Sequence, residues 1–419
     1  MKKKVLLKGP LLTRSGYGEQ ARFALRALRS RPDLFDIFVE PITWGKTSWI
    51  NDDSEERRFI DNACMKTVAH TQRGGSFDIS VQVTIPNEWE KIAPINVGYT
   101  AGVETTLVSP EWVQKGLLMD RIITTSKHST ESYASTSYTA TNKETGKVHN
   151  NFRLTTPIQE VSYSVRCAEE ENLDVDFSTD FNLLTVAQWG PRKNMENTIR
   201  WFLEEFSDDE NVGLIIKTNI MKNCIMDREY SLSKLKVHLD RVPDRKCKVY
   251  LLHGDLSTGQ MTSLYKNPKV KGLLSLTHGE GFGLPLFEAA CLGLPVIAPN
   301  WSGQVDFLNA RVKDKSKKYK NKSLFTKVTH TMGPAPPQAV WDTVIQKESQ
   351  WCYPDEKDSK RKMRQFYTNY DNALGKSKKL KQQIMKNFSA KKQHEKFVEQ
   401  ILLCGLDASP SSQKVMVFD

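Results

Sequence analysis

The sequence lacks a long apolar run, and that absence excludes a membrane-spanning helix. No stretch approaches the roughly 20 consecutive apolar residues that a bilayer-spanning helix requires. The start of the chain, Met1 to Pro10, is basic but has no apolar stretch of the kind found in signal peptides. We therefore expect a soluble, cytoplasmic protein. Its 419 residues are too many for one ordinary core and suit two domains.

Cysteine and metal-ligand patterns are also missing. The seven cysteines are scattered, odd in number and never spaced as CxxC, which excludes a disulfide framework and a zinc-ribbon type of site. No cluster of His and Asp has the spacing of a metal site. The composition thus favours a reducing compartment, and we expect neither a metal nor a bound cofactor.

Positive charge is abundant and unevenly distributed. The net charge is +11, and two segments, 311–323 with net +6 and 356–396 with net +9, exceed that total between them. Clustered Lys and Arg mark either a surface for a polyanion, such as nucleic acid or anionic lipid, or simply solvated loops and helix faces. Both interpretations stay open on composition alone.

The order of short apolar, β-branched runs and helical stretches predicts the fold class. The two alternate along most of the chain, as in α/β domains with parallel sheets and crossover helices. We predict two Rossmann-like domains facing a cleft, 1–165 and 166–388, with the C-terminal segment 389–419 as a candidate to pack back on the first domain. The polar residues 138–153 are predicted to form a surface loop.

The sharpest motif runs from Ser275 to Ala298, where a strand is followed by a glycine-rich turn and a helix. Gly281 and Gly283 allow a ligand to approach the backbone, and the amides at the helix start suit a phosphate. Glu280 lies in the turn and Glu288 a turn into an otherwise apolar helix. A surface carboxylate is the simple interpretation of Glu288, but its apolar surroundings favour a functional one.

This segment resembles the Glu, seven residues, Glu signature of family-four-type retaining glycosyltransferases with the two-Rossmann (GT-B) fold. The resemblance implies that Glu280 meets the donor sugar and that Glu288 binds the ribose. It also implies that Gly281, Phe282, Gly283 and Leu284 offer backbone groups to the sugar and phosphate.

A second match opens the predicted donor domain. Phe181 to Asn197 resembles the strand, glycine and Arg-Lys-Asn of the same family. Arg192 and Lys193 follow Gly190, and two fixed cations there would neutralise a departing diphosphate. Lys217, at the end of the next strand, is a further donor-side candidate. A purely structural role for this lysine agrees with the sequence equally well.

The first half carries weaker signals. Gly16 and Gly18 resemble the family's glycine loop between the first strand and first helix, where they would approach the donor. Glu104, in Tyr99-Thr-Ala-Gly-Val-Glu, is a candidate to hold the acceptor or accept a proton, or a plain loop carboxylate. The family's usual active-site histidine is not found, and His128 is a poor substitute.

The resemblance implies retention of configuration, and we take a UDP-sugar as the donor of this hexosyl- or pentosyltransferase.

For the acceptor we predict double-stranded DNA carrying a 5-hydroxymethyl pyrimidine, such as 5-hydroxymethylcytosine, because the chain is similar to phage-type transferases. The compartment of the protein would then be the host cytoplasm. Arginines on the opening loop and helix are predicted to contact this DNA, three of them at i, i+4, i+7 spacing: Arg14, Arg22, Arg26 and Arg29. The basic segments 311–323 and 356–396 would hold flanking phosphates.

Two alternatives remain. The same charges would suit an anionic membrane surface and a lipid-linked or surface glycan as acceptor. The second alternative is a nucleotide- or DNA-binding module without catalysis. Four residues speak against it: Glu280, Glu288, Arg192 and Lys193.

Overall fold

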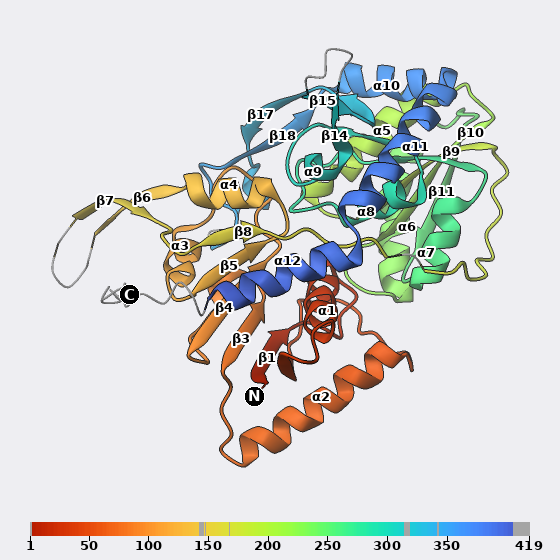
Figure 1. Ribbon diagram of the computed structural model, residues 1–419. Helices are drawn as coiled ribbons and strands as arrows, with labels where there is room; N and C mark the ends of the chain where they lie inside the picture. The colour runs from red at the N-terminus through yellow and green to blue at the C-terminus, as the bar shows by residue number, and fades with distance from the viewer. Residues whose placement is uncertain are drawn as a thin grey trace. The chain divides into compact units, whose positions relative to one another are not determined.

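The computed structural model describes residues 2–141, 146, 148–166, 168–313, 319–341 and 343–404 (Figure 1). The chain forms two compact units. The first unit comprises residues 1–164, 335–349 and 390–419, and the second unit comprises 165–334 and 350–389. No helix in the described ranges is both long and apolar enough to span a bilayer.

A six-stranded parallel sheet forms the centre of the first unit. Its strands lie in the order β2 (Phe35–Pro41), β1 (Lys3–Gly9), β3 (Ile79–Val83), β4 (Ile95–Thr100), β5 (Arg121–Thr124) and β8 (Ile158–Glu160). The helical segments are α1 (Gly16–Arg29), α2 (Glu55–Gln72), η1 (Pro86–Glu88), α3 (Pro110–Gly116), α4 (Lys127–Ser135), η3 (Pro337–Ala339) and α12 (Ala390–Leu403). Strand order reverses between β1 and β3, which is the switch point at which α/β sheets bind ligands.

Helix α1 illustrates why these residues fold as they do. Ser15 caps the helix by accepting a hydrogen bond from the amide of Gly18. Its apolar side chains are buried, and Phe23 meets Phe397 of α12 edge to face, with ring centroids 5.8 Å apart. The C-terminal helix therefore completes the core of the first unit.

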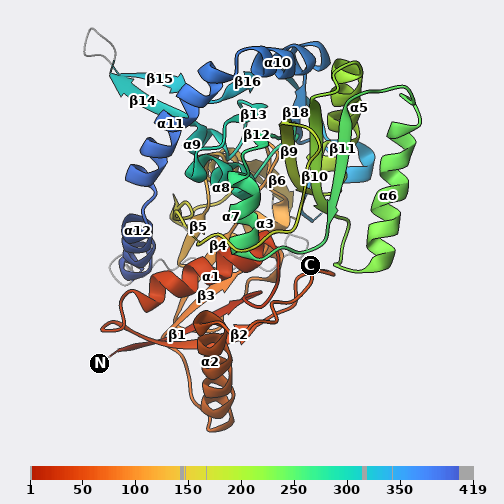
Figure 2. The same cartoon turned by 90° about the vertical axis from the view of Figure 1, so that its right-hand side faces the viewer.

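The second unit repeats the architecture (Figure 2). Its parallel sheet has the order β11 (Lys248–His253), β10 (Val212–Asn219), β9 (Phe181–Gln188), β12 (Val270–Leu274), β13 (Val296–Pro299) and β16 (Thr326–Val328). Its helical segments are η2 (Pro191–Lys193), α5 (Met195–Phe206), α6 (Ile225–Leu239), α7 (Thr258–Lys266), α8 (Leu284–Leu292), α9 (Val305–Leu308), α10 (Glu356–Thr368) and α11 (Tyr370–Asn387). The prediction of two Rossmann-like domains is confirmed by these two sheets.

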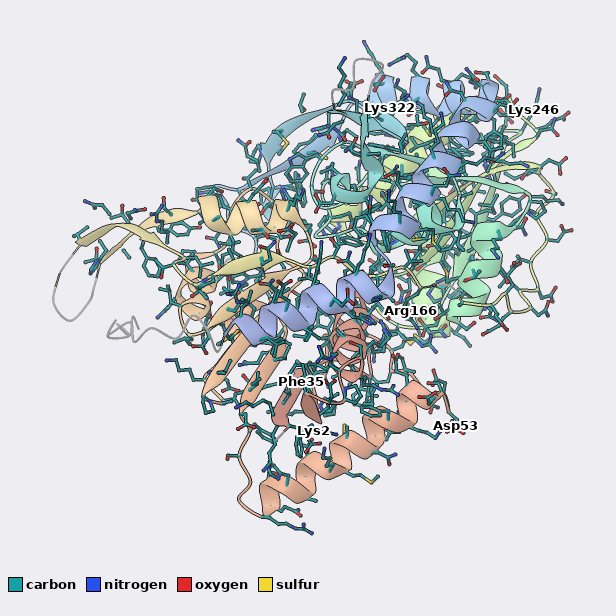
Figure 3. The ribbon with its side chains drawn as sticks, in the orientation of Figure 1. Lys2, Phe35, Asp53, Arg166, Lys246 and Lys322 are labelled. Atoms are coloured by element: carbon teal, nitrogen blue, oxygen red, sulfur yellow. The ribbon has the colours of Figure 1, made fainter. Side chains whose placement is uncertain are left out.

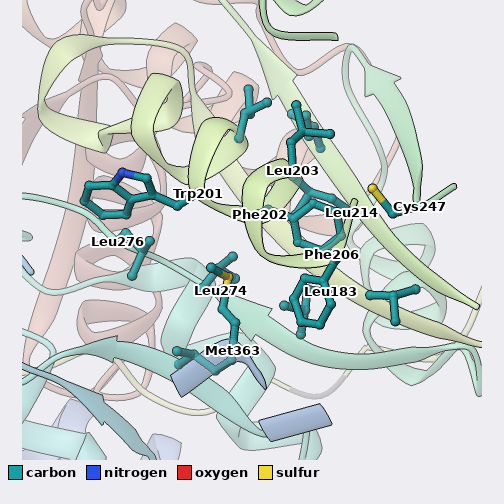
Figure 4. Close-up of a cluster of buried hydrophobic side chains, with 14 of the residues drawn as sticks. Leu183, Trp201, Phe202, Leu203, Phe206, Leu214, Cys247, Leu274, Leu276 and Met363 are labelled. Atoms are coloured by element: carbon teal, nitrogen blue, oxygen red, sulfur yellow. The ribbon is translucent and has the colours of Figure 1, made fainter. Parts of the chain in front are cut away.

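The core of the second unit lies between its sheet and the helices α5 and α10 (Figure 4). Phe202 and Phe206 of α5 pack with Leu183 and Leu274 of the sheet, and Met363 brings α10 into the same cluster. Burying each such side chain stabilises the fold by roughly 1.5–3 kcal/mol. This core fixes the sheet whose carboxyl edge carries the candidate site.

The structure differs from the sequence-based expectations in two short segments. Residues 138–153 contain an antiparallel pair, β6 (Ser137–Thr141) and β7 (Val148–Arg153), where a loop was predicted. Residues 335–349 belong to the first unit although the domain prediction assigned them to the second. Their place follows from packing, because Val344 is buried against Val103 and Trp112.

Two further antiparallel pairs occur in the second unit: β14 (Asn309–Lys313) with β15 (Tyr319–Ser323), and β17 (His330–Pro334) with β18 (Gln350–Pro354). The first pair contains much of the basic segment 311–323. Residues 314–318 of that segment lie outside the described residues.

Candidate functional site

Two loops meet at the carboxyl edge of the second sheet. One follows β9 and contains Gly190, Arg192 and Lys193, and the other follows β12 and contains Glu280. Strands β9 and β12 are neighbours at the point where the strand order reverses. That position is where open α/β sheets bind their ligands.

The structure brings Glu280, Arg192 and Lys193 together. Lys193 Nζ lies 2.6 Å from Glu280 Oε1, and Arg192 Nη1 lies 3.1 Å from Oε2 and 2.7 Å from the carbonyl oxygen of Gly279. Burial alone would raise the pKa of Glu280, but the charges of Lys193 and Arg192 outweigh it and lower the pKa to about 2. The carboxylate is therefore ionised at neutral pH, and the three side chains together carry one positive charge.

The main chain of Glu280 is held by residues that the sequence analysis did not identify. Its amide donates to Ser302 Oγ at 2.8 Å, and its carbonyl oxygen accepts from the amide of Gly303 at 2.9 Å. Ser302 has φ 66°, which is uncommon for a residue other than glycine and marks a locally constrained backbone. The polar pair Ser302-Gly303 shortly after β13 was the available signal.

The glycine-rich turn leads directly into α8. Gly283 precedes the helix with φ 96°, a left-handed conformation that favours glycine. Phe282 points into the core against Phe287 and Phe307, so only its main chain is available to a ligand. Gly281 and Leu284 flank it, so the turn lies directly at the start of α8, and its role in holding a phosphate stays a prediction.

Glu288 lies on α8 with an exposed side chain, and its Oε2 accepts a hydrogen bond from the hydroxyl of Tyr265 at 3.2 Å. Glu280 by contrast is 6% exposed. The two carboxylates therefore have different surroundings, one buried among cations and one open to solvent. This arrangement suits the different roles that the resemblance implies for them.

His278 also supports the site, and the sequence analysis did not identify it. Its ring stacks on Trp351 with centroids 4.7 Å apart, its Nδ1 lies 2.6 Å from the carbonyl oxygen of Cys352, and its amide donates to the carbonyl of Arg192. Burial lowers its pKa, with Arg192 adding to that effect, so the ring is neutral at pH 7. His278 fixes the loop that carries Arg192 relative to the loop that carries Glu280.

Lys217 ends β10 at the same carboxyl edge, one strand beyond β9. Its ammonium donates a hydrogen bond to the carbonyl oxygen of Gly254, and burial lowers its pKa. This contact supplies the structural role that the sequence analysis weighed equally with donor binding.

The first unit holds the remaining candidates. Gly18 packs against its own loop, since a Cβ there would come within 2.1 Å of the carbonyl oxygen of Thr13, whereas Gly16 is exposed. Glu104 follows β4 and lies near Tyr17; burial chiefly raises the pKa of Tyr17, and Glu104 adds to the rise. His128 is largely buried in α4, and burial lowers its pKa to about 4.

The prediction that the arginines of α1 form a DNA-binding face is wrong for three of them. Arg22 is buried and donates to the carbonyl oxygens of Leu11 and Thr13 at 2.7 and 3.0 Å. Arg26 pairs with two carboxylates, Glu19 and Glu56, and Arg29 pairs with Glu55. The three share one side of the helix, as predicted, but that side meets the protein's own loop and α2. Arg14 alone is exposed.

The chain is similar to known proteins in part of its sequence and in its fold. Residues 245–321, which include Glu280 and Glu288, match the family model described as "Glycosyl transferases group 1". No curated protein sequence matches the chain.

Solved structures with the same architecture cover nearly the whole chain. A glycosyltransferase from Rickettsia africae has a TM-score of 0.59 at 14% identity, covering 97% of this chain and 100% of that one. Sucrose-phosphate synthase from Thermosynechococcus elongatus also has a TM-score of 0.59, at 12% identity, with 97% and 100% covered. Anabaena HepE in complex with UDP and glucose has a TM-score of 0.56 at 10% identity, with 96% and 99% covered. These likenesses establish the fold, GT-B, and together with the family match they support a glycosyltransferase.

Proposed function

We propose that the chain is a retaining glycosyltransferase that moves a hexosyl or pentosyl group from a UDP-sugar to a hydroxyl acceptor. The observation that carries this proposal is the group formed by Glu280, Arg192 and Lys193. Two cations and one carboxylate at the switch point of the sheet leave positive charge for a diphosphate. The UDP and UDP-glucose found with Anabaena HepE support the choice of uridine donor.

The chemistry required of this site is stabilisation of a leaving group. A sugar–diphosphate bond is already activated, so the charge that develops on the departing diphosphate must be met by fixed positive groups. Arg192 and Lys193 would turn from Glu280 toward the diphosphate oxygens, and the amides at the start of α8 would add to them. The bond between the anomeric carbon and the diphosphate oxygen would break, and the acceptor hydroxyl would bond to that carbon on the same face, which retains the configuration. The hydroxyl proton would pass to the departing diphosphate oxygen.

Glu280 and Glu288 have complementary parts in this proposal. Glu280, released from part of its ion pairing, would accept hydrogen bonds from the sugar hydroxyls, and Glu288 with Tyr265 would hold the ribose. No metal enters the proposal, because two protein cations meet the diphosphate charge.

A donor screen tests the proposal. The full chain is incubated with nucleotide-sugars of different bases, and released nucleotide is measured by mass spectrometry. We expect turnover of UDP-sugars, and a loss of about 10²-fold for Glu288→Ala if its ribose hydrogen bonds are charge-assisted. Glu229→Ala, which removes an exposed carboxylate on α6, is the matched control. Equal activity of the two variants would contradict the role of Glu288.

For the acceptor we propose DNA with a 5-hydroxymethyl pyrimidine, now supported by the second unit and not by α1. Helix α11 exposes Lys378, Lys379 and Lys381, which could contact phosphates along a duplex. A lipid-linked or surface glycan is the second candidate. Its support is an exposed apolar stripe on α6, where Met226, Tyr230 and Val237 lie beside basic residues.

Transfer to hydroxymethylated and unmodified DNA across a salt series separates the two acceptors. Phosphate contacts predict activity on modified DNA that falls steeply with salt. Transfer to a lipid-linked glycan, with none to DNA at any salt, would replace the first candidate by the second.

A further inference from the structure

A cavity of about 590 Å³ lies in the second unit, bordered by the start of β16, the end of α10 and the beginning of α11. Three lysines from these three elements line it: Lys327, Lys362 and Lys376. Amide side chains of Gln365 and Asn372 line it as well. The polar side chains in the described lining of the cavity are therefore either cationic or neutral.

Among the residues that the structure describes, no carboxylate lines this cavity, and two other lysines act on Lys376. The charged neighbours of Lys376 are Lys362 and Lys322 of β15, and both repel its charge in addition to the cost of its partial burial. Figure 3 labels Lys322 at the end of that strand. Among the ion pairs found in the described part of the chain, none includes Lys322, Lys327, Lys362 or Lys376. Like charges held together without a counter-charge favour an anion.

The cavity is separate from the donor site. Strand β16 runs parallel to β13, with Thr326 opposite Ile297 and Val328 opposite Pro299. The lining residue Thr326 thus lies at the amino end of its strand, whereas Glu280 and Arg192 follow the carboxyl ends of β12 and β9. The two sets of cations lie at opposite edges of one sheet.

We propose that this cavity binds a compact phosphorylated small molecule, with its phosphate groups held by Lys362, Lys376 and Lys327. Its volume is in the range of about 300–1,000 Å³ that accommodates one small ligand. Phe325 and Phe366, both buried, provide an apolar wall for the rest of such a molecule. Lysine ammonium groups bind phosphate as point charges, and Gln365, Asn369 and Asn372 add neutral polar side chains to the lining. This inference is independent of the acceptor proposed above.

Titration of the full chain with inorganic pyrophosphate by calorimetry tests the site. The variant Lys362→Gln with Lys376→Gln keeps the length of both side chains and removes two charges from the cavity. Lys246→Gln with Lys248→Gln removes two charges from exposed positions elsewhere in the second unit and serves as the matched control. We expect the cavity variant to lose a binding event, or at least tenfold in its affinity, and the control to stay within about twofold of wild type. Equal titration of the wild type and the cavity variant would overturn the proposal, because all bound pyrophosphate would then lie elsewhere, for example at Arg192 and Lys193.

A second probe separates the sources of phosphate. A short unmodified DNA duplex replaces pyrophosphate, with the same two variants. If binding of the duplex depends on Lys362 and Lys376 while binding of pyrophosphate does not, the cavity is a contact for nucleic acid, and the small-molecule proposal fails.

The ligand-free protein gives an independent readout. Relief of the repulsion that Lys362 and Lys322 exert on Lys376 predicts that Lys376→Gln raises Tm by about one degree or more relative to Lys246→Gln. Pyrophosphate should raise the Tm of wild type and of the control, and much less that of the cavity variant. A Tm of Lys376→Gln at or below that of the control would show that the lysines are not held against one another, contrary to the proposal.

Discussion

The arginines of α1 and the cation pair of the second unit both form ion pairs with carboxylates, yet the two sets differ in what surrounds them. Arg26 and Arg29 pair with glutamates that α2 supplies at positions 55 and 56, and Arg22 donates to the main chain of the neighbouring loop. Arg192 and Lys193 instead share the single carboxylate of Glu280 at the carboxyl edge of a sheet. The first set ties elements together, and the second lies at the switch point of its sheet, where open α/β sheets bind ligands.

The difference shows that a count of basic residues does not identify a binding surface. In α1 each guanidinium has an acceptor within the same unit, so the helix contributes stability and little free charge. In the second unit two cations share one carboxylate, so these three side chains together carry one positive charge. The predictions below test this contrast, from the largest expected effect to the smallest.

The largest effect is expected for Arg192→Ala. If Arg192 stabilises the departing diphosphate, its loss lowers kcat by about 10²–10³-fold. The measurement is release of UDP from a UDP-sugar, with circular dichroism to show that the fold is intact. Arg200→Ala is the control, because Arg200 lies on α5 of the same unit and pairs with Glu204 and Glu356. A rate near that of wild type would remove the distinction between the two sets of cations.

The second effect concerns the charge of Glu280. Because its folded-state pKa of about 2 lies below the ordinary value of 4.5, ionised Glu280 stabilises the fold above pH 4.5, and that contribution is lost as pH falls toward 2. The full difference between these two pKa values corresponds to roughly 3 kcal/mol of unfolding free energy. Urea unfolding of wild type and Glu280→Gln is compared between pH 6 and pH 3, and the gap in unfolding free energy should narrow as the pH decreases. A gap that does not change with pH would mean that Glu280 is not coupled to its two cations.

The third effect is on stability alone. Arg22→Ala leaves two buried carbonyl oxygens without their charged donor, which we expect to cost about 2 kcal/mol in unfolding free energy. Arg29→Ala removes a partly exposed ion pair with Glu55 and should cost less than about 1 kcal/mol. Urea denaturation measures both. If Arg22→Ala left stability unchanged and instead weakened binding to DNA, α1 would be a binding surface after all.

The fold class was predicted correctly from the sequence, and the candidate residues Glu280, Arg192 and Lys193 were found there, for a definite physical reason. Strand, turn and helix signals are local, and the motif around Glu280 concentrates its glycines and carboxylates within a few residues. Ser302 and His278 were missed because their roles depend on contacts with segments distant in sequence or on main-chain hydrogen bonds. The arginines of α1 were misassigned because helical spacing shows which residues share a side and does not show what that side meets.

The hairpin at 138–153 was missed for a related reason. Its strands are polar and largely exposed, so they lack the apolar alternation that marks a strand packed on a core. The placement of 335–349 was likewise decided by tertiary packing around Val344, which no local pattern encodes.

The smallest expected effect is that of a chelator, and it sharpens the contrast between the two sets of cations. If Arg192 and Lys193 supply the positive charge that the diphosphate requires, a divalent ion is not needed for the leaving group, and the rate of transfer in EDTA should stay within about twofold of that without it. A metal carried by the donor itself would reveal its role by a different pattern: EDTA would then raise KM for the UDP-sugar and leave kcat unchanged.

The measurement is therefore a full saturation curve for the donor with and without EDTA, repeated in the Lys193→Ala variant. If EDTA lowered the kcat of the wild type and added Mg²⁺ or Mn²⁺ restored it, the result would contradict the assignment of leaving-group stabilisation to the protein's own cations. The assignment would be supported most directly if divalent ions restored the activity of Lys193→Ala while EDTA left the wild-type rate unchanged. The metal would then replace the charge that Lys193 provides.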